Sequence, residues 1–170
     1  MKEFSREAEQ IMIDRFGKDT IIAVATTENE TPYVRYVNAY YENAAFYIIT
    51  HVLSDKMKHI KDNSVVAIAS EWFTAHGKGV SLGYFGKKEN CVIAEKLKKA
   101  FAEWIDNGHT DFSDENTIIL CVQLTEGILF SHGTRYDIDF SGNSLRSAKT
   151  IPAIVTEKGA CESISILDQE

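Results

Sequence analysis

The stretch that decides the fold reads Tyr33-Val34-Arg35-Tyr36-Val37-Asn38-Ala39-Tyr40-Tyr41, then Glu42-Asn43-Ala44, then Ala45-Phe46-Tyr47-Ile48-Ile49-Thr50. β-Branched and aromatic residues dominate both flanks, and such side chains pack well on pleated strands. The three residues between the flanks suit a tight hairpin connection. The stretch therefore predicts two antiparallel strands, over residues 33–41 and 45–50.

Other patterns along the chain predict the neighbouring elements. Ser54 is a typical N-cap, and Asn107-Gly108 and Gly17 are typical helix ends. The predicted helices cover residues 3–16, 55–60 and 88–105. The further predicted strands cover residues 21–26, 65–72, 78–85, 117–124 and 127–131, the last two as a second hairpin. Six or seven strands joined mostly by hairpins, with three helices, predict an antiparallel barrel or sandwich.

Composition agrees with a mainly β fold. The chain has 170 residues, with 28 Ile and Val against 8 Leu, and 18 aromatic residues. Leu is commoner in helices, so an all-helical bundle is not expected. A chain of this length can bury a sizeable core. We expect one domain over residues 1–140, with residues 141–170 as a C-terminal extension or an edge strand of that domain.

The charge balance limits the partners. With 18 Lys and Arg against 25 Asp and Glu, the formal net charge is −7. Binding to nucleic acid or to an anionic membrane surface needs a basic face, so neither partner is expected. No apolar run reaches the roughly 18 residues that span a bilayer. The three cysteines contain no CxxC pair, and the simplest expected compartment is a reducing cytoplasm.

One segment predicts an anion site inside this acidic chain. The predicted hairpin places Arg35 beside the strand that leads, through Thr50, into the helix start at Ser54. A helix start offers free backbone N–H groups, and Arg presents a fork that matches phosphate oxygens. Lys56 adds a second positive charge. The alternative is that Arg35 and Lys56 are solvated surface charges and Ser54 is only a cap.

The order of these elements resembles the pyridoxamine 5′-phosphate oxidase-like superfamily of FMN-binding split-barrel proteins. The likeness runs over about residues 5 to 135 and is strongest across residues 33–68, through Arg35-x-Val37-Asn38, Thr50, Ser54-x-Lys56 and Asn63-x-Val65. It implies a split β-barrel with FMN as cofactor. The implied phosphate ligands are Arg35, Thr50, Ser54 and Lys56. The residues implied to lie near the flavin ring or ribityl chain are Tyr36, Val37, Asn38 and Ile49.

The resemblance also implies a homodimer with the flavins at the subunit interface. Candidates for the surface of the partner chain that covers the ring are Trp72, Phe73, His76 and Phe130, although ordinary packing is the better interpretation for each. His51 could contact the cofactor, but a histidine at a strand end is more often structural.

Other kinds of chemistry have weak support. The glycines of residues 77–86 match no phosphate-binding spacing and are better interpreted as strand curvature. Ser131-His132-Gly133-Thr134 lacks the GxSxG elbow of a hydrolase, and the histidines show no metal-ligand spacing. We therefore expect no catalytic side chain and no metal ligand.

The expected function is that of an FMN-dependent oxidoreductase acting on a small electron acceptor, since the flavin itself would carry the redox chemistry. A non-catalytic flavin-binding protein for stress or storage is the alternative. Residues 141–170 contain a single arginine, Arg146, and no Trp. The resemblance implies a C-terminal segment with both Arg and Trp in the pyridoxamine 5′-phosphate oxidases themselves. The chain is more similar to the short general-stress and nitroimidazole-resistance relatives.

Overall fold

Six antiparallel strands of the computed structural model close into a barrel, and a seventh strand extends it. The structure describes residues 6–141. The strand order is β3-β2-β1-β4-β5-β6-β7, and an additional pairing of β3 with β6 closes the ring. The elements are α1 (Arg6–Phe16), β1 (Thr20–Glu28), β2 (Thr31–Glu42), β3 (Ala45–His51), α2 (Asp55–Asp62), β4 (Val65–Ser70), β5 (Phe73–Tyr84), a 3₁₀ turn (Lys88–Asn90), α3 (Cys91–Ala100), β6 (Thr117–Ser131) and β7 (Thr134–Asp139).

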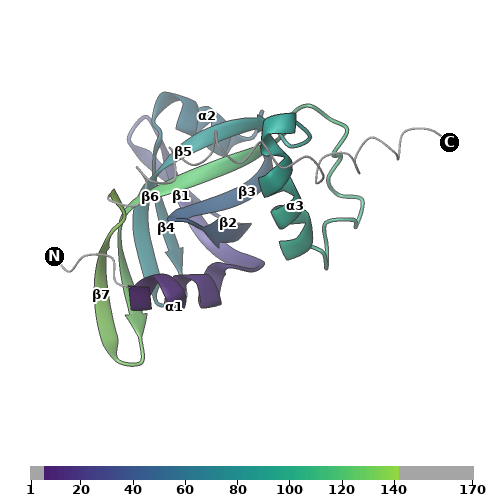
Figure 1. Ribbon diagram of the computed structural model, residues 1–170. Coiled ribbons are helices and arrows are strands. Elements are labelled where there is room, and N and C mark those ends of the chain that lie inside the picture. The colour runs from purple at the N-terminus through teal and green to yellow at the C-terminus, as the bar shows by residue number, and fades with distance from the viewer. Residues whose placement is uncertain (1–5, 142–170) are drawn as a thin grey trace.

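The barrel interior is filled from the strands and from one helix. Along β1, Ile22 and Val24 point inward while the residues between them are more exposed, as the two-residue period of a strand requires. Figure 1 shows α1 lying across one end of the barrel and α3 along its side. From α1, Phe16 enters the core, where its ring centroid lies 5.7 Å from that of Phe46 and 5.4 Å from that of Phe73. The helix therefore plugs one end of the barrel.

A second apolar cluster lies on the outside of β3 and β6. Leu97 of α3 and the following Phe101 pack with Tyr47 of β3 and Ile119 of β6. These residues alternate along their strands with side chains that face the barrel interior. Because α3 covers only this side, the outer faces of β1, β2 and β4 have no helix over them within residues 6–141 (Figure 1).

The sheet splits between β2 and β3. Pairing between these strands is confined to Tyr40–Glu42 against Ala45–Tyr47, whereas β2 pairs with β1 from Thr31 to Ala39. Beyond the paired segment the two strands diverge. Arg35 lies on one side of this opening and Thr50 on the other. The fold is the split antiparallel barrel that the sequence predicts.

Most predicted elements are confirmed, with four corrections. The segment of residues 117–131 is one continuous strand instead of a hairpin, because Thr125 is accommodated as an extra residue where β6 crosses the register shift at His76/Gly77 of β5. Strand β5 begins at Phe73, since residues 71–72 form a turn that ends β4 at Ser70. Helix α3 ends at Ala100, well before residue 105. Strand β7 has no counterpart in the prediction.

Glycines on β5 mark curvature, as predicted. One register shift falls between His76 and Gly77, and a second between Ser81 and Tyr84. At Gly79 a Cβ atom would lie 2.9 Å from Cδ1 of Ile60 on α2, so a larger residue would require the Ile60 side chain to move. The glycine therefore helps to seat α2 against the barrel.

The prediction for residues 141–170 concerns a segment that, apart from Ser141, lies outside the described residues. No helix within residues 6–141 has the length and apolar character needed to cross a membrane.

Candidate functional site

Arg35 projects from β2 beside the split in the barrel. It pairs with Val24 of β1, and its side chain is half-buried. Nη1 of Arg35 donates to Oγ1 of Thr26 at 2.7 Å and to the carbonyl oxygen of Val24 at 3.3 Å. Within residues 6–141 these are the only hydrogen bonds of the guanidinium, so Nε and Nη2 have no protein acceptor there. The guanidinium is therefore held through Nη1, while Nε and Nη2 remain as hydrogen-bond donors for a ligand.

Thr50, Ser54 and Lys56 form a second group where β3 leads into α2. Oγ of Ser54 lies 3.4 Å from Oγ1 of Thr50, and Nζ of Lys56 lies 3.4 Å from the same Ser54 oxygen. Ser54 occupies the N-cap position, as predicted, yet its hydroxyl makes no capping hydrogen bond. Ser54 therefore links the hydroxyl of Thr50 to the Lys56 ammonium beside the helix start.

Electrostatics link the two groups. Partial burial lowers the pKa of Lys56, and the nearby Arg35 lowers it further, while Asp55 opposes this effect. Partial burial also lowers the pKa of Arg35, with Asp55 again in opposition. Asp55 itself pairs with Lys58 at 2.8 Å, and no carboxylate in the described part of the chain forms an ion pair with Arg35 or Lys56.

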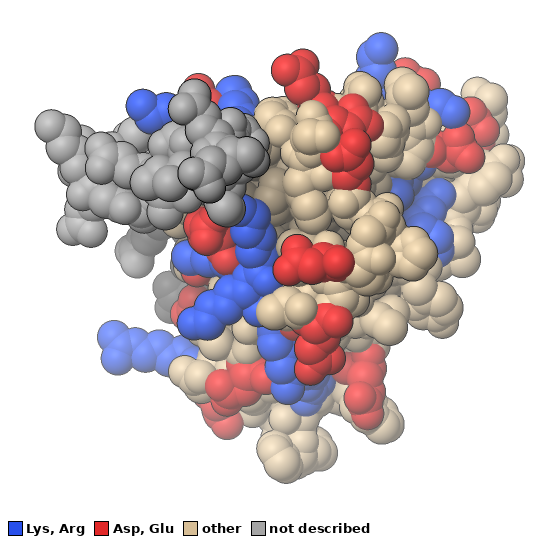
Figure 2. Space-filling model, turned by 90° about the vertical axis from the view of Figure 1, so that its right-hand side faces the viewer, with Lys and Arg blue, Asp and Glu red and all other residues tan. Residues whose placement is uncertain are grey.

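Two half-buried cations with no carboxylate in ion-pair contact among the described residues suit the binding of an anion. On the side of the molecule where α3 lies, Figure 2 shows Lys and Arg side chains interspersed with Asp and Glu. The structure therefore brings together the four residues predicted to bind a phosphate, and their chemistry suits an anion.

The four residues predicted near the flavin ring or ribityl chain do not form one group. Tyr36 is 79% exposed, while Val37 packs against the main core. Nδ2 of Asn38 donates to Oδ1 of Asp19 at 2.8 Å. Ile49 packs against the cluster under α3. Of these four, Tyr36 is the most open to a ligand.

The four residues considered as a cover for the flavin of a partner chain differ in how deeply they are buried. Phe73 is a core residue, whereas Trp72 is 66% exposed at the turn between β4 and β5. Phe130 is partly exposed next to it, and its backbone N–H donates to the carbonyl oxygen of Trp72 at 2.8 Å. His76 is exposed and lies 3.2 Å from a carboxylate oxygen of Glu126. Trp72 and Phe130 are therefore available for a contact with another molecule.

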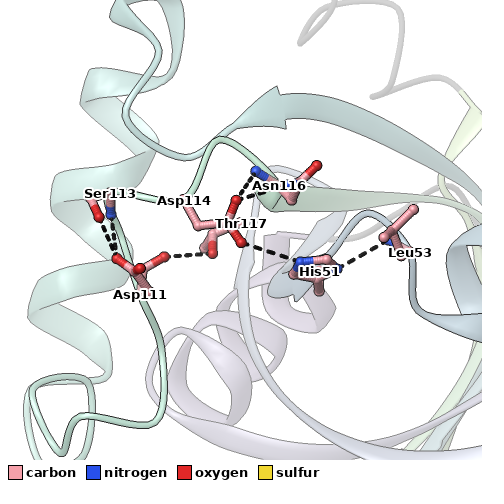
Figure 3. Close-up of polar contacts among 7 residues, drawn as sticks. All are labelled: His51, Leu53, Asp111, Ser113, Asp114, Asn116 and Thr117. Atoms are coloured by element: carbon pink, nitrogen blue, oxygen red, sulfur yellow. Dashed lines mark hydrogen bonds and ion pairs between the residues drawn. The ribbon is translucent and has the colours of Figure 1, made fainter.

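His51 holds the segment that leads into α2 (Figure 3). Its Nδ1 accepts a hydrogen bond from the backbone N–H of Leu53 at 3.2 Å, and its Nε2 lies 3.3 Å from Oδ2 of Asp114. Hydrogen bonds from Asn116 lower the pKa of Asp114, which keeps its carboxylate charged. The bonds to Leu53 and Asp114 agree with the structural interpretation of His51.

Two further residues of the site have no counterpart in the prediction. Oγ1 of Thr26 lies 2.9 Å from Nδ1 of His59, and both side chains are buried. The signal for them is weak but present, because Thr26 and His59 are polar residues at positions where the strand and helix patterns place core side chains.

Two hollows lie near the outer face of the sheet. One is lined by Ala23, Ala25, Ala67 and Ala69, and also includes Val34. The other lies beside Ile21 and Tyr36. Neither hollow includes Arg35 or Lys56. Within residues 6–141 no group of three or more His, Cys, Asp or Glu could hold a metal ion.

No family model matches the chain, and no curated protein matches its sequence. Solved structures share its fold. General stress protein 26 from Bacillus anthracis strain Sterne is 12% identical, the match covers 76% of this chain and 97% of that protein, and the TM-score is 0.57. For a NimC/NimA family protein from Clostridium acetobutylicum the identity is 15%, the coverages are 79% and 95%, and the TM-score is 0.54.

A FAD-binding protein from Mesorhizobium loti is 10% identical, with coverages of 69% and 90% and a TM-score of 0.56. At such identities the likeness shows the fold alone. The barrel closed by β3 and β6, the opening between β2 and β3, and these matches lead to one conclusion. The chain has the split antiparallel barrel fold of these solved proteins.

Proposed function

We propose that the chain binds a flavin through its phosphate group, with FMN as the cofactor and Arg35, Lys56, Ser54 and Thr50 as the phosphate ligands. The carrying observation is the pair of half-buried cations, which have no carboxylate partner in the described part of the chain. A phosphate offers several charged acceptors to the guanidinium, the ammonium and the hydroxyls. The FAD-binding structural neighbour adds support for a flavin, while the choice of FMN rests on the resemblance in sequence.

In this proposal the isoalloxazine ring of the flavin lies at the split between β2 and β3. Beyond Tyr40 and Tyr47 the facing edges of these strands are no longer paired with each other, so they offer backbone groups to the polar edge of a flavin. Tyr36, the next residue along β2 from Arg35, presents an exposed aromatic ring on the opposite face of the strand. Val37, Asn38 and Ile49 are proposed as neighbours of the ring or ribityl chain on the resemblance alone.

A bound flavin would supply the redox chemistry, accepting and delivering hydride or single electrons. The residues of this chain would bind and orient it, so no acid, base or nucleophile is required of them. The proposed activity is that of a flavin-dependent oxidoreductase with a small electron acceptor. A flavin-binding protein without turnover is the second candidate.

The proposal includes a homodimer with the flavins at the interface. Ile21, Val34 and Tyr36 are large, exposed side chains on the outer faces of β1 and β2, and the alanine-lined hollow lies beside them. An apolar face of this kind is typical of an interaction surface. Arg35 lies between Val34 and Tyr36 along β2, so a second copy seated on this face would lie next to the strand that carries the proposed phosphate ligand.

The deciding experiment is a titration of the purified protein with FMN, FAD and riboflavin, followed by flavin fluorescence. We expect FMN to bind and riboflavin to bind more weakly. A protein that is colourless and takes up no flavin would contradict the proposal. Anaerobic mixing of the flavin-loaded protein with NADH or NADPH then separates the two functions. Bleaching followed by reoxidation with a quinone or a nitro compound indicates an enzyme, and no turnover indicates a binding protein.

A further inference from the structure

Two buried polar side chains lie directly behind Arg35. Thr26 on β1 is 1% exposed and His59 on α2 is 5% exposed. The other buried positions near them are apolar, namely Val24 on β1 and Met57 and Ile60 on α2. Buried polar groups weaken a fold unless they are hydrogen-bonded, and packing alone would accept valine and leucine here. Their presence therefore calls for an explanation beyond packing.

The bond between Arg35 and Thr26 has a defined direction. A guanidinium can only donate, so Oγ1 of Thr26 accepts from Nη1 of Arg35 at 2.7 Å. The Thr26 hydroxyl keeps its own proton for Nδ1 of His59, 2.9 Å away, in the tautomer of His59 that carries its ring proton on Nε2. Nε2 faces a carboxylate oxygen of Glu28 at 3.8 Å. The ring of Tyr33, with its centroid at 4.9 Å, flanks the imidazole.

The chain of bonds fixes the orientation of the guanidinium. Nη1 is turned toward Thr26 and Val24, so Nε and Nη2 remain for a ligand. A free arginine side chain loses considerable rotamer freedom when it binds an anion. If hydrogen bonds within the protein already fix the guanidinium, the side chain loses little further rotamer freedom when the ligand binds.

We propose that Thr26 and His59 are positioning residues that pre-orient Arg35 and so set the preference for a phosphorylated flavin over riboflavin. This inference rests on the proposed function. It assigns to the Thr26–His59 pair a role in selectivity for the phosphate group, because the pair acts on the ligand only through Arg35. Its effect should therefore appear in the ratio of the FMN affinity to the riboflavin affinity.

The test compares this ratio in wild-type protein and in Thr26→Val, which keeps the side-chain shape but removes the hydroxyl. We expect the ratio to fall about tenfold, as for the loss of a hydrogen bond to a charged group. The riboflavin affinity should stay close to that of the wild type. Thr26→Ser restores the hydroxyl and should restore the ratio. His59→Leu removes the acceptor of that hydroxyl and should lower the ratio in the same direction.

A double-mutant cycle with Arg35→Ala identifies the route of the effect. In the Arg35→Ala background, Thr26→Val should leave the ratio unchanged. Thermal unfolding shows which variants are folded, and His59→Leu serves if Thr26→Val is not. A wild-type ratio near one contradicts the proposed phosphate site itself. A high wild-type ratio that survives both variants, or an equal loss of FMN and riboflavin affinity, overturns the role of Thr26 and His59.

Discussion

Arg35 and Lys56 are placed where neither charge is fully hydrated and neither has a carboxylate partner among the described residues. Such an arrangement costs stability in the free protein, because burial and mutual repulsion both disfavour the charged forms. Proteins accept costs of this kind mainly at binding sites. The two charges are therefore expected to strengthen the binding of an anion and to lower the stability of the free protein. The two effects can be measured separately.

Replacing either cation should weaken FMN more than riboflavin. A hydrogen bond to a charged group contributes about 1.5–3 kcal/mol, so Arg35→Ala and Lys56→Ala should each reduce FMN affinity about ten- to hundredfold. Riboflavin affinity should change little, because riboflavin has no phosphate. Lys61→Ala is the matched control, since Lys61 is an exposed cation on the same helix. Equal losses for both ligands would reject the phosphate role.

Without flavin, removing the Lys56 charge should stabilise the protein. The folded-state pKa of Lys56 lies below its usual value of 10.5, so the folded chain releases this proton more readily than the unfolded chain does. Between the two pKa values the unfolded state binds more protons, and stability rises with pH. At neutral pH the penalty is fully present, and Lys56→Met should remove it.

The measurement is urea unfolding of the flavin-free protein from pH 7 to pH 10.5. We expect Lys56→Met to be more stable than wild type at pH 7, with the difference shrinking as the pH approaches 10.5. Lys61→Met, at an exposed position, should show no such trend. A Lys56→Met variant that is less stable than wild type at pH 7 would refute the assigned repulsion and burial.

At the scale of elements, tight hairpins determine which strands become neighbours. Asn29 and Glu30 have φ values of 46° and 65°, and Asn43 and Ala44 have values of 51° and 59°. Positive φ at both central residues is what a type I′ turn requires, and its twist matches that of the flanking strands. Asn accepts this conformation, but Glu and Ala are strained in it.

Glu30→Gly should stabilise the protein by up to about 1 kcal/mol. The left-handed conformation costs a non-glycine residue about 1–2 kcal/mol, and part of that gain is offset by the greater freedom of glycine in the unfolded chain. Glu30 is exposed, so little packing is lost. Thermal and urea unfolding measure the change. The control is Thr31→Gly, which lies in β2 and should be destabilising; a Glu30→Gly variant that unfolds as readily as Thr31→Gly would contradict the explanation.

The same elements show what the sequence could and could not predict. The strands around residues 33–50 are predicted because their side chains and their turn indicate the same structure. The continuity of β6 through Thr125-Glu126-Gly127 is not predicted, because a glycine beside polar residues suggests a turn. The strand stays extended there through its pairing with β5 and β7. Strand β7 was missed, although His132 and Gly133, with φ values of 47° and 76°, form its hairpin turn.

The candidate site divides in a similar way. Arg35, Thr50, Ser54 and Lys56 are found from the hairpin and the helix start, which are local features. The Thr26–His59 pair depends on how α2 packs on β1, a contact between segments far apart in sequence. Local patterns do not encode such a contact.

For the whole molecule, the exposed outer face of β1 and β2 is the main unexplained surface. Val34 is 72% exposed and lies opposite Ala25 in the β1–β2 pairing. A monomer gains nothing from displaying such side chains together, whereas a dimer buries them. The outer side of β3 and β6 needs no partner, because α3 already covers it.

Val34→Lys should therefore dissociate the proposed dimer. A charge placed in an apolar interface must be desolvated without a partner, which disfavours association. Sedimentation velocity at micromolar concentration should show a dimer for wild type and a monomer for the variant. Val92→Lys changes a partly exposed valine on α3 and should remain dimeric. A monomeric wild type in the presence of FMN would rule out the interface.

The long strand β6 also bears on how the chain folds. It pairs with β3, β5 and β7, and its bond to β3 joins His51 to Thr117 across a large sequence separation. During synthesis the strands up to β5 emerge first. The edges of β3 and β5 that pair with β6 therefore stay unpaired until β6 has been synthesised. Closure of such non-local contacts is slow, and open strand edges favour aggregation. The folding rate of this barrel should therefore be limited by the pairing of β6 with β3 and β5. Truncated chains that end before residue 117 should precipitate.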